Sequence, residues 1–203
     1  MNTDSTTKPY LGFGNQKVGR AWTFSLPSLI TCPGASPWCL THCYAARLER
    51  IRPNCREKYA WNLLASLSTE DFVSSILRQI PDVPGLVRVH VCGDFFNAAY
   101  AKAWMTICRA RPRLLAWTYT RSWTSDKLRP SLERLRARPN MQVLASCDPT
   151  MPSPPPGWRV AWIVGDSRAR GLPCRAQQGT VASCLDCGYC FTAQTGDVVF
   201  RRH

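Results

Sequence analysis

Apolar and polar positions along the chain follow two periods, one typical of strands and one typical of helices. The clearest strand signal lies at residues 86–92, where Val87, Val89 and Val91 alternate with Arg88 and His90. The same signal predicts strands at residues 22–26, 86–92, 114–120, 141–145 and 159–164. The pattern therefore places short strands at intervals along most of the chain.

Segments with an apolar stripe at helical spacing lie between these strands. One begins with Ser68-Thr-Glu-Asp, which resembles a capping box, and places Phe72, Ile76 and Ile80 on one face. Asn97 is a favourable N-cap for a later helix. Helices are predicted from residue 40 onward, at 56–67, at 68–80, at 97–111 and at 126–138.

The alternation of strands and helices predicts an α/β fold with a parallel sheet and right-handed crossovers. Such a sheet is either open or curled, and we expect this one to curl into a partial (β/α) barrel formed by residues 1–165. A proline-rich connector at 149–156 precedes the last predicted strand, and the periodicity is lost beyond residue 165. Residues 166–203 are therefore predicted to form a small C-terminal module organised by its cysteines.

Loops that follow parallel strands meet at one edge of the sheet, where α/β folds place their active sites. Four such loops carry cysteines or polar residues, around residues 32, 92–94, 120–121 and 146–148. Tyr119 and Arg121 alternate to the same side of one strand, so an aromatic ring and a cation can meet one ligand. The simpler interpretation of Tyr119 is core packing. These loops form the candidate site.

The C-terminal segment contains the run Cys184-Leu-Asp-Cys187-Gly-Tyr-Cys190, with Cys174 ten residues upstream. Closely spaced thiolates in this pattern are typical of ferredoxin-like runs, in which short loops carry successive thiolates to separate irons. Zinc is the alternative, but a four-cysteine zinc site usually pairs two C-x2-C knuckles, and here a third cysteine follows at once. We therefore predict a 4Fe–4S cluster at these cysteines, with zinc as the alternative.

A second group of cysteines follows the first predicted strand as Cys32, Cys39 and Cys43, in a C-x6-C-x3-C pattern. Cys39 and Cys43 would share one face at the start of a helix, while Cys32 approaches from the preceding loop. Three thiolates would leave one iron of a 4Fe–4S cluster open. His42, Cys55 or a small molecule could fill that position, and a thiolate from Cys55 would close the centre.

The composition indicates the cellular compartment and the kinds of binding partner to expect. Eleven cysteines, an odd number, favour metal binding over a disulfide framework in a reducing compartment. No apolar run approaches the roughly 20 residues that cross a bilayer, so we expect a cytoplasmic protein without a membrane partner. The 26 Lys and Arg exceed the 13 Asp and Glu, and basic residues are concentrated at 109–138. A polyanion such as nucleic acid is therefore a candidate partner, although a solvated helix face gives the same pattern.

Five segments form an ordered set of motifs that covers most of the chain. They are Thr23-Phe-Ser-Leu-Pro27, Thr31-Cys-Pro-Gly-Ala35 followed by Cys39 and Cys43-Tyr-Ala45, Val89-His-Val-Cys-Gly-Asp-Phe-Phe96, Thr118-Tyr-Thr-Arg-Ser-Trp123 and the final cysteine run. This set resembles that of the gene product 88 family of phage and plasmid proteins. In that family's pattern a serine precedes the glycine–aspartate pair, whereas this chain has Cys92, a further candidate ligand.

The motif order is also similar to that of radical S-adenosylmethionine enzymes, where a three-cysteine loop after the first barrel strand precedes a glycine–acid motif. Those enzymes use C-x3-C-x2-C and usually Gly-Gly-Glu, so this chain departs from them at both motifs. The resemblance implies that S-adenosylmethionine would bind the open iron, with Asp94 accepting hydrogen bonds from its amino group. The cofactor-binding residues implied are Gly93, Asp94, Tyr119 and Arg121. The alternative for Asp94 is a turn residue at a strand end.

Two functions compete at this point. The leading hypothesis is an iron–sulfur, radical S-adenosylmethionine-like redox enzyme with an auxiliary C-terminal cluster. The alternative is a nonenzymatic iron–sulfur or zinc protein whose arginine-rich surface binds nucleic acid. An open iron in the first centre favours the enzyme, and full coordination favours the binding protein.

Overall fold

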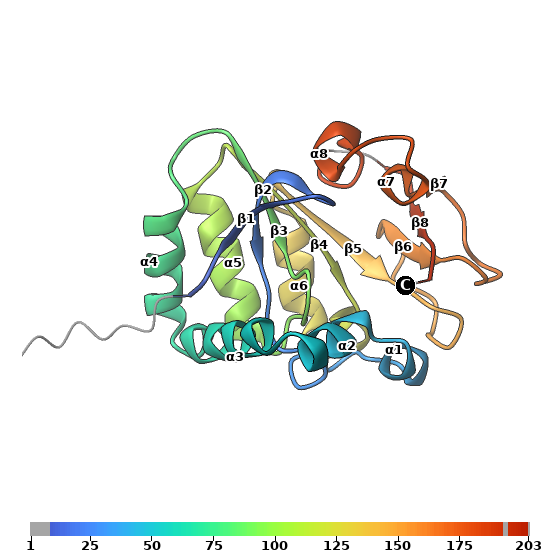
Figure 1. Ribbon diagram of the computed structural model, residues 1–203, viewed down its shortest axis with the longest axis horizontal. Coiled ribbons are helices and arrows are strands. Elements are labelled where there is room, and N and C mark those ends of the chain that lie inside the picture. Colours follow the sequence, from blue (N-terminus) through green and yellow to red (C-terminus); the bar gives the residue numbers. More distant parts are fainter. Residues whose placement is uncertain (1–8, 193–194, 203) are drawn as a thin grey trace, which may run out of the picture.

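The computed structural model describes residues 9–192 and 195–202, and within these residues eight strands form one sheet (Figure 1). The order across the sheet is β1-β2-β3-β4-β5-β6-β8-β7. The strands are β1 (Gly12–Asn15), β2 (Gly19–Phe24), β3 (Gly85–Val89), β4 (Leu114–Thr120), β5 (Met141–Ser146), β6 (Val160–Ile163), β7 (Leu172–Pro173) and β8 (Val198–Phe200). β1 and β2 are antiparallel, and the other neighbouring pairs are parallel. The predicted α/β class with a mostly parallel sheet is confirmed.

The sheet is open, with β1 at one edge and β7 at the other. The predicted curling into a partial barrel is therefore not confirmed. A separate C-terminal module is not confirmed either, because β7 and β8 lie within residues 166–203 and extend the same sheet. Leu172 N, for example, donates to the Asp197 carbonyl oxygen at 2.9 Å. The predicted boundary after residue 165 stays a prediction.

Three helices cover one face of the sheet, because β2 to β6 follow one another in chain order and right-handed crossovers then return on the same side. α4, α5 and α6 lie on that face (Figure 1), and their apolar stripes pack with Phe24, Trp104 and Leu132 in the main core. The helical elements are α1 (Pro37–Thr41), α2 (Tyr44–Ile51), α3 (Pro53–Leu67), α4 (Thr69–Gln79), α5 (Ala98–Ala110), the 3-10 helix η1 (Ser122–Thr124), α6 (Arg129–Arg136), α7 (Arg175–Gln178) and α8 (Cys184–Cys187). None of the described helices is long and apolar enough to span a membrane.

The C-terminal segment covers part of the opposite face. Val18, Ala21, Trp117 and Phe191 form a second apolar cluster there, which joins β2 and β4 to the residues after α8. A Cβ on Gly19 would lie 2.8 Å from the Leu185 Cβ, so α8 packs directly on the backbone at the start of β2. The sheet is thus buried on both faces around β2, β3 and β4.

Several element boundaries differ from the predicted ones. The strand predicted at 86–92 ends at Val89, because His90 has φ 65° and its N–H and that of Val91 both donate to the Phe24 carbonyl oxygen. The helix predicted from residue 40 is two helices, α1 and α2, with Cys43 between them as the N-cap of α2. Ser68, the first residue of the predicted capping box, makes no hydrogen bond to the backbone of α4. Its hydroxyl donates to the carboxylate of Asp71 instead. β1 was not predicted, since its four residues include two glycines and show no alternation.

Candidate functional site

The seven cysteines predicted as ligands lie in two groups, and each group lines a cavity. The first cavity has a volume of about 200 Å³ and lies at the carboxyl ends of the central strands. The second cavity, of about 20 Å³, lies under the C-terminal segment. Cys32, Cys39 and Cys43 line the first cavity, and Cys174, Cys184, Cys187 and Cys190 line the second. The fold thus groups these cysteines as their spacing predicted, while their role as ligands stays a prediction.

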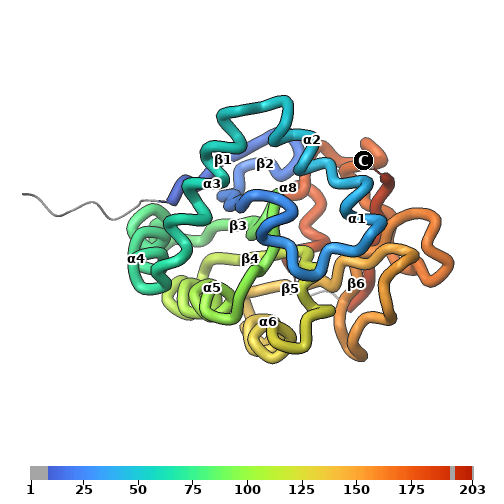
Figure 2. The backbone as a smooth tube through the Cα atoms, turned by 90° about the horizontal axis from the view of Figure 1, so that it is seen from below, coloured from blue at the N-terminus to red at the C-terminus, as the bar shows by residue number. Residues whose placement is uncertain are grey.

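The edge of the first cavity is built from the loops predicted to meet there. Figure 2 shows the segment before α1, with α1 and α2, crossing the sheet edge at which β3 and β4 end. Cys92, Gly93, Asp94, Arg121 and Cys147 also line this cavity, so the loops after β3, β4 and β5 contribute to it. Gathering of these loops at one edge was predicted from the strand order and is confirmed.

Two glycines let the motifs of this edge interlock. A Cβ on Gly34 would lie 2.0 Å from the Arg121 carbonyl oxygen, so the backbone there leaves no room for a side chain. Gly93 has φ 78°, and a Cβ on it would lie 2.7 Å from Thr31 Oγ1. Asp94 N donates to the same Thr31 oxygen at 3.4 Å. The cysteine loop, the glycine–aspartate pair and the end of β4 are therefore packed backbone to backbone.

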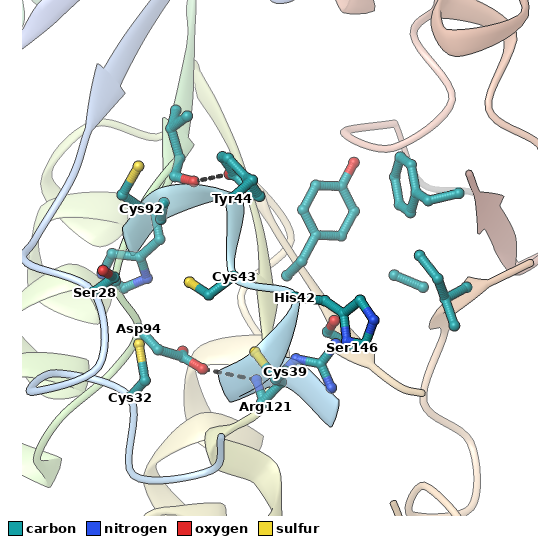
Figure 3. A pocket seen from close by; sticks show the side chains of 18 of the residues that line it. Ser28, Cys32, Cys39, His42, Cys43, Tyr44, Cys92, Asp94, Arg121 and Ser146 are labelled. Carbon is teal, nitrogen blue, oxygen red and sulfur yellow. Dashed lines mark hydrogen bonds between the residues drawn. The ribbon is translucent and has the colours of Figure 1, made fainter. Parts of the chain in front are cut away.

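The sulfur atoms of Cys32, Cys39 and Cys43 face a common space (Figure 3). Cys39 is held at the start of α1, where its N–H donates to Ser36 Oγ at 3.0 Å. Cys43 caps α2, and its Sγ accepts from the Ala46 N–H at 3.5 Å. Helix starts of this kind favour an anion through their free N–H groups. The backbone around both residues is therefore suited to thiolates.

The two further cysteines considered for the first group have different surroundings. Cys92 lines the cavity, but its Sγ lies 3.8 Å from Tyr59 Oη and points away from the three sulfurs (Figure 3). Cys55 is not among the described residues that line this cavity and packs in a small apolar cluster with Cys92 and Cys43. The imidazole of His42 lines the cavity and stacks on Trp38. Three thiols thus face one space in Figure 3, and two further cysteines, Cys92 and Cys147, line the same cavity.

Asp94 is buried, and its carboxylate holds the turn after β4. Oδ1 accepts from Phe95 N at 2.7 Å and from Thr120 Oγ1 at 2.6 Å. Oδ2 accepts from the N–H groups of Arg121 at 2.8 Å and Ser122 at 3.2 Å. A carboxylate has about four lone-pair sites, so these four bonds occupy them. The geometry gives Asp94 a turn-stabilising role, and its contact with a cofactor stays a prediction.

Asp148 links the cysteine loop to the same edge. Ser36 Oγ donates to its Oδ2 at 2.6 Å, Arg121 forms an ion pair with it, and the Thr150 N–H donates to Oδ1 at 2.9 Å. Because Ser36 also accepts from Cys39 N, one chain of bonds joins Cys39, Ser36, Asp148 and Arg121. Arg121, which also lines the cavity, is thus a structural cation with a carboxylate partner.

Tyr119 and Arg88 form a wall between the two cavities. Both residues line both of them, together with Lys17 and Phe200. The Arg88 guanidinium lies 5.2 Å from the Tyr119 ring centroid, and the Phe200 ring packs edge-on against the same tyrosine at 5.2 Å. Tyr119 was predicted to bind a cofactor or to pack in the core, and the structure places it where it can do either.

The second group is fixed by contacts to β8 and to the turn between β1 and β2. Cys174 N donates to the Val199 carbonyl oxygen at 2.8 Å, which ties the start of α7 to β8. Cys184 N donates to the Lys17 carbonyl oxygen at 2.8 Å, in the turn between β1 and β2. Ser183 caps α8 by accepting from Asp186 N at 3.4 Å. Four cysteines from a segment of 17 residues therefore converge beside Lys17.

Burial raises the pKa of some of the thiols in both groups. It raises the pKa of Cys32 to about 12, with the nearby Asp94 charge as a further cause, and that of Cys190 to about 11. The pKa of Cys39 is also raised by burial, although the Arg121 charge opposes the rise. A bound metal would deprotonate them, because the thiolate is the ligand form.

Among the described residues, His, Cys, Asp and Glu side chains form no group of three or more that could hold a single metal ion. A cluster of several irons binds its thiolates through different iron atoms, so its ligands are spaced more widely than those of one ion.

Sequence reasoning missed three residues of the cavity walls. Arg88 looked like the exposed position of an alternating strand, and no local signal reveals that the C-terminal segment covers it. Lys17 lies in a turn that was not predicted. His90 is buried with an unpartnered Nδ1, and burial lowers its pKa to about 3, so it is neutral at pH 7.

The basic stretch at 109–138 is largely engaged within the chain. Arg111 Nε donates to the Ile80 carbonyl oxygen at 3.0 Å, and the Arg136 guanidinium lies over the Trp158 ring. Ion pairs in the described residues join Arg113 to Asp82, Arg121 to Asp148, Arg129 to Asp126 and Arg136 to Glu133. These contacts reduce the charge that this stretch can offer to a polyanion.

Comparison with known proteins places the chain among phage proteins. The family model for Gene product 88 matches residues 2–193. The Gene 88 proteins of Mycobacterium phage L5 and Mycobacterium phage D29 are each 33% identical over 125 residues, which cover 55% of this chain and 52% of each relative. The chain thus spans about half the length of the curated relatives it matches.

No solved structure matches the chain, and these comparisons give no support to the resemblance to radical S-adenosylmethionine enzymes. The family assignment has direct support, because the matching model covers residues 2–193. This range includes both cysteine groups. The chain belongs to the gene product 88 family.

Proposed function

We propose that this protein is an iron–sulfur protein with two 4Fe–4S centres, the first of which has an open iron of the radical S-adenosylmethionine type. The observation that carries the proposal is the first cavity, where three cysteine sulfurs face about 200 Å³ of free space. The second cavity has four cysteines and about a tenth of that volume. The first site has room for a small molecule beside a centre, and the second has a full set of ligands.

The proposal includes a partial (β/α) barrel as the scaffold of the first centre, and the strand order supports this. Strands β2 to β6 lie side by side in chain order and are parallel, with their helices on one face. This is the strand order of a (β/α) barrel before closure. The three cysteines follow β2, the first parallel strand, and the glycine–aspartate pair follows β3. The C-terminal cysteine module would then be an auxiliary centre attached to the last strands.

Several residues of the first cavity suit S-adenosylmethionine. A reduced cluster would supply the electron that cleaves this cofactor. The stacked rings of Trp38 and His42 offer a flat surface for its adenine, and Lys17 offers a cation for its carboxylate. Asp94 would position the loops through its four hydrogen bonds, so contact with the cofactor amine requires one of these bonds to be exchanged.

Metal analysis of protein purified without oxygen tests the iron–sulfur assignment. We expect iron and acid-labile sulfide in amounts that correspond to two clusters. Cys43→Ser should lose the first centre and Cys187→Ser the second, because each change removes a thiolate. Cys108→Ser is the control, since Cys108 is buried between α5 and the sheet, outside both groups. A colourless protein that holds zinc alone would contradict the assignment.

Electron paramagnetic resonance of the reduced protein tests the open iron. Adding S-adenosylmethionine should change the signal of one centre, and the change should be absent in Cys43→Ser. Cys55→Ser is the matched control, because Cys55 packs in the same apolar cluster as Cys43 but does not line the cavity. If the wild type ignores the cofactor and Cys55→Ser alone responds, Cys55 is the fourth ligand and the first centre is closed.

A closed first centre would favour the alternative, a nonenzymatic iron–sulfur or zinc protein that binds nucleic acid. The net charge of +13 is the observation in its favour. Its affinity for nucleic acid would then fall steeply with salt.

A further inference from the structure

Arg88 is a buried cation for which the described chain supplies no anionic partner. It projects from β3 on the face opposite the helices, because its neighbours Val87 and Val89 belong to the main core. The residue is 8% exposed, and its Nε has no hydrogen-bond partner. In residues 9–192 and 195–202 no carboxylate forms an ion pair with it.

Such a cation is costly, because the guanidinium cannot lose its proton and must be desolvated. The titratable groups near it are the phenols of Tyr44 and Tyr119, the second cation Lys17, and the thiols of Cys92, Cys184 and Cys190. None of these groups is a carboxylate, the side chain that usually pairs with a guanidinium. The part of the chain that the structure describes therefore supplies no carboxylate partner for Arg88.

The position of Arg88 indicates where the missing negative charge lies. Its side chain lines the cavity of the first cysteine group and also that of the second. The Tyr119 ring holds the guanidinium between them at 5.2 Å from the ring centroid. A metal that binds either group would turn neutral thiols into thiolates and so bring negative charge to this cation.

We propose that Arg88 is the shared counter-cation of the two cysteine sites, and that its charge stabilises the centre bound at each. This inference rests on the proposed function, because it needs anionic centres at both sites. Reduction adds an electron to a centre and makes it more negative. A cation shared by both centres therefore favours reduction of both, and its removal lowers both reduction potentials.

Reductive titration of Arg88→Met, loaded with ferrous iron and sulfide, tests this inference. We expect the equilibrium constant for one-electron reduction of each centre to fall at least about tenfold, which is about 59 mV in midpoint potential. Arg88→Lys should keep both potentials close to those of the wild type, because it keeps the charge. Electron paramagnetic resonance distinguishes the two centres.

Arg159→Met is the matched control. Arg159 is also buried, and its guanidinium lies over the ring of Tyr189, 5.3 Å from the ring centroid. Unlike Arg88, it lines neither of the two cysteine cavities. Its guanidinium donates to the Tyr189 carbonyl oxygen at 3.1 Å, next to Cys190. Its removal should leave the potential of the first centre unchanged.

The metal-free proteins give a second measurement. Replacing a buried, unpaired cation with an apolar side chain of similar length is often neutral or stabilising. Metal-free Arg88→Met should therefore resist urea at least as well as the metal-free wild type. A clear loss of stability would mean that Arg88 supports the fold itself, and would overturn the inference.

The outcomes separate this inference from the proposed function. If both centres form and Arg88→Met shifts neither potential, or shifts one alone, Arg88 is not a shared counter-cation, while the iron–sulfur assignment stands. If the wild type binds no iron and sulfide, both the assignment and this inference are overturned.

Discussion

Two buried carboxylates at the edge of the first cavity have opposite electrostatic environments. Burial raises the pKa of Asp94 more than its four hydrogen bonds lower it. For Asp148 burial also raises the pKa, but hydrogen bonds from Ser36 and Thr150 and the charge of Arg121 outweigh it, so its pKa lies below the usual value. Asp148 is therefore the carboxylate whose ionised form stabilises the fold.

Asp148→Asn should lower the free energy of unfolding at pH 7 by about 1–3 kcal/mol, because the Arg121 cation loses its partner. The contribution of Asp148 is complete above the unfolded pKa of about 3.9 and is lost as the pH falls through the lower folded pKa. The difference between the two proteins should therefore shrink below about pH 4. Urea unfolding at pH 7 and at acid pH measures it.

Asp126→Asn is the control for this prediction, since Asp126 is an exposed partner of Arg129 and should contribute little at either pH. A stability difference for Asp148→Asn that stays constant with pH would show that the lost interaction does not depend on ionisation.

At the scale of elements, the loop from β2 to α1 is anchored at its start by Leu26 in the main core, and its part around Cys32 is positioned by close backbone packing. Gly34 touches the carbonyl group of Arg121, and Ser36 bonds to Asp148 at the end of β5. The loop is therefore fixed to two strands that lie far from it in the sequence. This explains why a short motif around Cys32 can hold a defined geometry.

Gly34→Ala should displace this loop, because the new Cβ would lie 2.0 Å from the Arg121 carbonyl oxygen. We expect a loss of stability of about 1–3 kcal/mol and reduced iron content at the first centre, with the second centre retained. Gly85→Ala is the control, since a Cβ there would make an ordinary contact with Leu114 at 3.5 Å. Equal iron content in the two variants would contradict the proposed role of the loop.

At the scale of the whole molecule, the two cysteine groups lie on either side of one wall in the sheet. The first group comes from a loop after β2, and the second comes from the segment between β7 and β8. Cys184 bonds to the turn before β2, the strand whose other end leads into the loop of the first group. Arg88 and Tyr119, from adjacent central strands, separate the two groups. Under the proposed function, a change of charge at one centre would therefore act on the other through the shared Arg88 cation.

Part of the fold and of the site followed from local signals. Alternating valines predicted β3, and the spacing of Phe72 and Ile76 predicted α4, because each period is set by the local backbone geometry. The spacing within each cysteine run predicted its grouping, since short loops keep neighbouring thiols together. The meeting of the strand-end loops followed from the parallel order alone.

What the sequence determined by itself is the class of the fold, the two cysteine groups and the edge at which the first lies. The tertiary structure alone decided that the sheet stays open, that β7 and β8 extend it, and that Arg88 is buried between the groups. The physical reason is distance along the chain. Periodicity shows which face of the sheet a side chain lies on. The segment that covers this face is about a hundred residues away in the sequence, and periodicity does not reveal it. Here that segment buries Arg88, a polar position of the alternating pattern.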